Sequence, residues 1–267
     1  MAQRLIVIII LLPIALVAIY FGGWFYALMI LAFLGIASWE YWRMFTQGGF
    51  RPSLAIGIGG VVLLWLSRVL FNFNYSDLLL TLIVLSAMAV HTIDYERGVD
   101  CSASSFAVTL AGVMYLGWIG AYLISIRSMP DGLWWTLTIL PAVMWADTGA
   151  YLIGKRFGKH KFSPRVSPKK TWEGYLGGIL FALILTPLIA ACWHLFTPAV
   201  TPLDGLIIGA VIAVITPLGD LGESMLKRQF GLKDSSNLLP GHGGAMDRID
   251  SWLWAAAIGY YLVLWIK

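Results

Sequence analysis

The chain repeats apolar runs long enough to cross a lipid bilayer as helices, which takes about 20 residues each. About nine such segments follow one another, at 4–21, 24–45, 53–71, 76–91, 103–126, 132–153, 174–196, 203–226 and 247–266. Apolar and polar residues do not alternate along them as they do in the strands of a membrane β-barrel. Only 12% of the residues are charged, against about a quarter in an ordinary soluble domain. The sequence therefore predicts an all-α, polytopic integral membrane protein.

No polar stretch is long enough for a separate soluble domain, so we expect residues 1–267 to form a single transmembrane domain. Residues 1–140 supply spans without a recognisable motif, and residues 141–267 contain the polar segments that we expect to be catalytic. Residues 1–20 also suit a secretory signal peptide, but the apolar stretch is long and no small-x-small cleavage site follows it. We therefore expect it to be retained as the first span.

Basic residues fall mostly on one side of the predicted spans. If the N-terminus lies inside the cell, 15 of the 18 Lys and Arg residues face the cytoplasm. The other three are Arg68, Arg127 and Lys267. Short loops rich in Lys and Arg stay on the cytoplasmic side of a membrane. The sequence therefore predicts a cytoplasmic N-terminus and, with an odd number of spans, a C-terminus on the other side.

Residues 218–250 interrupt the apolar pattern with carboxylates, cations and glycines. Four residues follow the spacing i, i+3, i+4 and i+7 and so share one helix face: Asp220, Glu223, Ser224 and Lys227. Asp247 opens the next span, and if the two helices are neighbours it can meet Asp220. Carboxylates about 5 Å apart repel by about 3 kcal/mol at an effective dielectric near 20. A divalent cation removes this repulsion, and oxygen donors close to phosphates favour Mg²⁺.

Groups that suit phosphate binding surround these carboxylates. The turn "PGHGG" offers successive backbone N–H groups that can cradle phosphate oxygens. The loop after the sixth span contains "SPKKT", which combines cations with hydroxyl groups. Carboxylates for a metal, with cations and glycines for phosphates, are typical of phosphoryl or nucleotidyl transfer.

Other interpretations of these features stay open. Basic inner loops also set topology and contact anionic lipids. A carboxylate pair in a span serves an ion or proton path as readily as catalysis, although a transporter would place its acids near the middle of the bilayer. Glu40, near the inner end of the second span, could simply pair with Arg43 at i+3.

Two stretches resemble a known family, the phosphatidate cytidylyltransferases or CDP-diacylglycerol synthases. "SMLKRQFGLKDSSNLLPGHGGAMDRID", residues 224–250, resembles the family signature, and "DTGAYLIGKRFGKHKFSPRVSPKKTWEG", residues 147–174, resembles its second well-preserved stretch. The resemblance implies transfer of the cytidylyl group of CTP to phosphatidic acid in phospholipid biosynthesis, giving CDP-diacylglycerol and pyrophosphate. The alternatives are a CTP-dependent lipid kinase and a transporter coupled to cations or protons.

The resemblance also implies roles for particular residues. It makes Asp220, Asp247 and Lys227 catalytic, and Mg²⁺ is then held by Asp220 and Asp247 with support from Asp147 and Glu223. We expect the substrates to be bound by Ser167, Lys169, Lys170, Thr171, Arg228, Lys233, His242, Gly243, Gly244 and Arg248. A second cation and a homodimer stay open, and we expect no nucleic acid partner. We expect a bacterial inner-membrane protein whose active site faces the cytoplasm.

Overall fold

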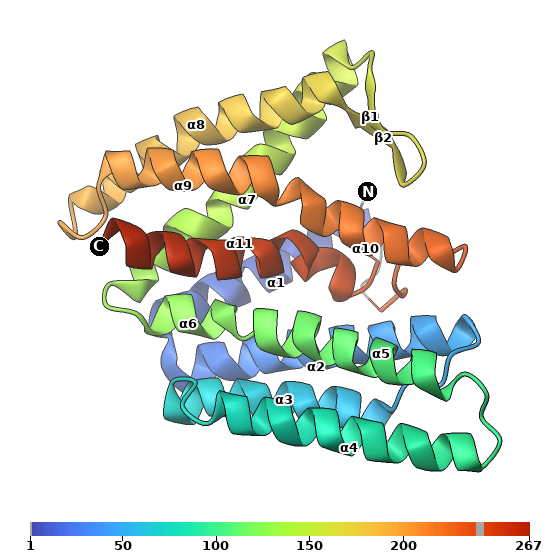
Figure 1. The fold of residues 1–267 in the computed structure, drawn as a ribbon. Helices are drawn as coiled ribbons and strands as arrows, with labels where there is room; N and C mark the ends of the chain where they lie inside the picture. Colours follow the sequence, from blue (N-terminus) through green and yellow to red (C-terminus); the bar gives the residue numbers. More distant parts are fainter. Residues whose placement is uncertain (1, 239–242) are drawn as a thin grey trace. The chain divides into compact units, whose positions relative to one another are not determined.

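The computed structural model describes residues 2–238 and 243–267, and the described chain is mostly helical (Figure 1). The elements in chain order are α1 (Ala2–Phe21), α2 (Gly23–Gln47), α3 (Leu54–Phe71), α4 (Ser76–Glu96), α5 (Ser102–Gly112), the π-helix η1 (Val113–Ile119), α6 (Tyr122–Ser128), α7 (Gly132–Phe157), β1 (Lys161–Ser163), β2 (Ser167–Thr171), α8 (Trp172–His194), α9 (Pro202–Ile215), α10 (Pro217–Gln229) and α11 (Met246–Ile266). Eight helical segments among the described residues are long and apolar enough to cross a membrane, and the Leu11–Phe21 part of α1 is a shorter apolar segment. The prediction of an all-α polytopic membrane protein is confirmed.

The predicted spans coincide with these helices apart from local differences. The fourth span extends to Glu96 instead of ending at 91. The fifth contains the π-helical turns of η1 between α5 and α6. The eighth is interrupted at Thr216, between α9 and α10. Pro217 explains this interruption, because proline has no N–H group to donate to the carbonyl four residues earlier.

The chain divides into two compact units, each made of two stretches of sequence. Unit 1 comprises Met1–Ser125 and Lys227–Ile249, and unit 2 comprises Ile126–Leu226 and Asp250–Lys267. The signature segment after Lys227 therefore folds with the N-terminal spans, which contain no motif of their own. That both units form one transmembrane domain stays a prediction.

Unit 1 packs its N-terminal helices around an apolar core. Leu64 of α3, Ile83 of α4 and Val113 of η1 meet in a buried cluster. The segment that follows α10 joins this unit through Phe230, whose ring lies 5.0 Å from that of Phe45, centroid to centroid. An added Cβ on Gly48 would collide with the Phe230 ring, so glycine lets this segment pack closely against the end of α2.

Unit 2 packs α7, α8 and α9 against one another (Figure 1). Small residues lie where these helices meet. An added Cβ on Gly178 of α8 would lie 2.6 Å from the carbonyl oxygen of Ala146 in α7, and one on Gly209 of α9 would lie 2.7 Å from that of Ala182. Small residues allow such close approach between helices in membranes. Between α7 and α8 the chain forms an antiparallel hairpin of β1 and β2, with Lys161 opposite Thr171.

The Gly178→Ala substitution is expected to destabilise unit 2. The new methyl group meets a backbone carbonyl, which cannot rotate away, so α7 and α8 must separate. Such overpacking costs about 1–3 kcal/mol. The matched control is Gly35→Ala in α2, where an added Cβ has no neighbour within 4 Å. Thermal unfolding of the detergent-purified variants measures the difference, and equal midpoints in the two variants would contradict this account of the helix contact.

Candidate active site

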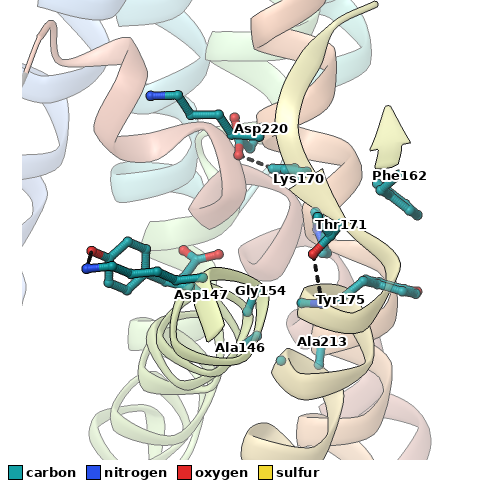
Figure 2. Close-up of a pocket in the computed structure, with 16 residues that line it drawn as sticks. Ala146, Asp147, Gly154, Phe162, Lys170, Thr171, Tyr175, Ala213 and Asp220 are labelled. Atoms are coloured by element: carbon teal, nitrogen blue, oxygen red, sulfur yellow. Dashed lines mark hydrogen bonds and ion pairs between the residues drawn. The ribbon is translucent and has the colours of Figure 1, made fainter. Parts of the chain in front are cut away.

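A pocket of about 450 Å³ lies in unit 2 between α7, α8, α9, α10 and the β2 strand (Figure 2). Its lining includes small residues, among them Ala146, Ala150, Gly178 and Ala213. Its polar lining residues are Asp147, Tyr151, Lys155, Lys169, Lys170, Thr171, Tyr175 and Asp220. A pocket lined by both apolar and charged groups suits an amphiphilic, anionic molecule.

The sequence placed Asp220 and Lys170 in the site, and the structure brings them together from α10 and β2. The Lys170 ammonium lies 2.6 Å from the Asp220 carboxylate (Figure 2). The Ser224 hydroxyl donates to the same carboxylate at 3.2 Å, as the predicted i, i+4 spacing on one helix face allows. Thr171 accepts the Gly174 N–H at 3.2 Å and so caps α8 where the hairpin ends.

Further carboxyl groups of unit 2 lie close to Asp220. Asp250 shares a hydrogen bond with Glu223 and interacts electrostatically with Asp220 and Asp147. Glu223 and Asp250 are both buried. Carboxyl groups gathered in this way repel unless a proton or a cation lies among them.

These carboxylates have the donor chemistry of a magnesium site. Among the residues that the structure describes, no three Asp, Glu, His or Cys side chains form a group that could hold a metal ion. Lys170 contacts Asp220 and Lys227 contacts Asp247, so each of these carboxylates already faces a positive charge. The donors are all carboxylate oxygens, which Mg²⁺ prefers, so the residues fit this ion by their chemistry.

A second polar cluster lies in unit 1 around Asp247. Its carboxylate contacts the Lys227 ammonium, and only 6% of the Asp247 side chain and 8% of the Lys227 side chain are exposed. It also accepts the Ser235 N–H at 2.9 Å, the Ser235 hydroxyl at 2.8 Å and the Gly244 N–H at 2.8 Å. Four donors therefore fix the orientation of Asp247 at the start of α11.

The two described glycines of the "PGHGG" turn make room for carboxylates. Gly243 has a φ of +79°, and an added Cβ there would lie 2.7 Å from the Asp247 carboxylate. An added Cβ on Gly244 would collide with Ser235 and Glu40. Because the Gly244 N–H already donates to Asp247, its predicted role in binding phosphate stays a prediction.

The remaining predicted site residues do not line the pocket of unit 2 or lie outside the described chain. Arg228, Lys233 and Arg248 are exposed, and Arg228 donates to the Leu232 carbonyl at 3.1 Å. Ser167 pairs with Ser163 in the hairpin. His242 lies outside the described residues.

Sequence reasoning missed several residues of these clusters. The pocket of unit 2 is also lined by Tyr151, Lys155 and Tyr175. Of these, only Lys155 could have been suspected from the sequence, because it belongs to the predicted basic loop. Glu40 does not form the suggested pair with Arg43, whose guanidinium lies over the Trp39 ring. Its carboxylate binds the signature segment instead. A carboxylate inside an apolar span is itself a signal of function.

Known proteins resemble this chain over nearly its whole length. The cytidylyltransferase family matches residues 2–266. A protein of Pseudomonas aeruginosa named phosphatidate cytidylyltransferase is 36% identical over 98% of this chain and 96% of its own length. Proteins of the same name are 31% identical in Bacillus subtilis, over 98% of this chain and 97% of that protein, and 34% identical in Haemophilus influenzae, over 93% of each. The chain therefore belongs to the cytidylyltransferase family.

Proposed function

We propose that this protein transfers the cytidylyl group of CTP to phosphatidic acid, giving CDP-diacylglycerol and pyrophosphate. The names of its relatives support this reaction. The observation that carries it is the pocket of unit 2, whose lining combines small apolar residues with lysines and carboxylates. Phosphatidic acid has an apolar body and an anionic headgroup, and so matches both kinds of lining residue.

Counter-charge is the first requirement of this reaction, because both substrates are polyanions that repel each other. Lys155, Lys169 and Lys170 bring three positive charges to the pocket. Lys227 brings another to the cluster around Asp247. We assign the pocket lysines to the lipid phosphate and Lys227 to the pyrophosphate that leaves. Preorganised cations of this kind stabilise the charge that develops in the transition state.

We propose that Mg²⁺ is held by Asp220 and Asp247, with Asp147 and Glu223 in support. A bound Mg²⁺ would neutralise charge on the phosphates of CTP and polarise the phosphorus that is attacked. Asp220 and Asp247 belong to different units, so their sharing of one ion stays a prediction. The phosphate of phosphatidic acid already carries an ionised oxygen, so the attack needs no strong general base.

The proposed reaction takes place at the cytoplasmic face of a bacterial inner membrane. The basic loops support this orientation, and the bacterial relatives support this location. CTP then reaches the site from the cytoplasm, while the acyl chains of the lipid stay in the bilayer. A homodimer and a second cation stay predictions.

The purified protein, given phosphatidic acid and CTP labelled at either the α- or the γ-phosphate, tests the reaction. We expect the α-label to enter the lipid and the γ-label to leave as pyrophosphate. We also expect EDTA to stop the reaction and added Mg²⁺ to restore it. A γ-label in the lipid would instead identify a CTP-dependent kinase. If neither the α-label nor the γ-label of CTP enters the lipid, both cytidylyl transfer and phosphoryl transfer are contradicted.

A further inference from the structure

Glu40 of α2 is fully buried, and four groups of the signature segment that can donate hydrogen bonds surround its carboxylate. The hydroxyls of Ser235 and Ser236 donate to it at 3.0 and 2.5 Å. The N–H groups of Ala245 and Met246, at the start of α11, donate at 3.0 and 2.8 Å. These four donors and the positive end of the α11 dipole compensate the buried charge.

Ser235 connects this carboxylate to Asp247. Its hydroxyl lies 3.0 Å from Glu40 and 2.8 Å from Asp247, and its single proton can serve only one of the two at a time. Its N–H donates to Asp247 at 2.9 Å. The Ser236 hydroxyl donates to Glu40 and makes no contact with Asp247. Ser235 therefore connects Glu40 to Asp247, whereas Ser236 does not.

We propose that Glu40 is a positioning residue, which holds residues 235–236 and 245–246 so that Asp247 and Lys227 keep the orientation that the transfer requires. This inference rests on the proposed function. Glu40 acts through Ser235 and through the first N–H groups of α11, and it does not touch the substrates. The N-terminal spans thus supply a carboxylate that helps to position the groups around Asp247.

A carboxylate suits this position because the Ser236 hydroxyl and the N–H groups of Ala245 and Met246 all donate to it. In Glu40→Gln, the amide nitrogen would turn N–H groups toward two of them, which leaves buried donors unsatisfied. We expect kcat to fall by at least about tenfold while KM for CTP changes by less than about threefold. We also expect hydrogen exchange at Ala245 and Met246 to accelerate by at least about tenfold.

The matched pair Ser235→Ala and Ser236→Ala separates positioning from simple anchoring. Each variant removes one hydroxyl from Glu40, and only Ser235→Ala removes a contact with Asp247. We expect kcat to fall about tenfold in Ser235→Ala and less than about threefold in Ser236→Ala, at similar thermal stability. Equal kcat values in the two variants would overturn the positioning role.

Hydrogen exchange keeps this test separate from that of the proposed reaction. If the wild-type protein forms no CDP-diacylglycerol, the proposed function fails, while exchange at Ala245 and Met246 still reports whether Glu40 holds them. Unchanged exchange in a folded Glu40→Gln variant would refute the inference even if the wild-type protein is fully active. Should Glu40→Gln fail to fold, the two serine variants decide the matter.

Discussion

The Asp247→Asn variant is expected to lose turnover by about a thousandfold or more, a loss of about 4 kcal/mol of transition-state stabilisation. It removes the negative charge that faces Lys227 and that we propose holds Mg²⁺. It is also expected to lose stability, because the Lys227 and Asp247 side chains are only 8% and 6% exposed. Removing one partner of a buried ion pair costs about 3–5 kcal/mol.

The double variant Lys227→Met/Asp247→Asn separates these two effects. It removes both buried charges together, so we expect its unfolding midpoint to return toward that of the wild-type protein while turnover stays lost. Thermal unfolding in detergent and the labelled-CTP assay measure the two quantities. Near-wild-type turnover of Asp247→Asn at saturating Mg²⁺ would remove Asp247 from the catalytic groups.

The spans could be predicted from the sequence because hydrophobicity and length alone decide them. Local backbone features could not: the π-helical turns of η1 have no signal in an apolar run. The i, i+4 contact of Ser224 with Asp220 was predictable because helix geometry fixes it.

Contacts between distant parts of the chain could not be predicted from the sequence. Glu40 lies 195 residues before Ser235, and its spacing suggested only a local partner, Arg43. The contact of Lys170 with Asp220 depends on how the hairpin packs against α10. Helix spacing identifies which residues share a face, but not which faces meet.

The Asp220→Asn variant is expected to lose turnover by about a thousandfold with little change in stability. The Lys170 and Asp220 side chains are 28% and 37% exposed, and an ion pair this accessible contributes about 0–1 kcal/mol. Lys170→Met, the matched control, breaks the same pair, so we expect the same small change in unfolding midpoint. Its turnover should fall less, because it keeps the carboxylate that we assign to Mg²⁺. Equal turnover in the two variants would show that the ion pair matters and not the Asp220 carboxylate, and wild-type turnover of Asp220→Asn at saturating Mg²⁺ would exclude Asp220 from the metal site.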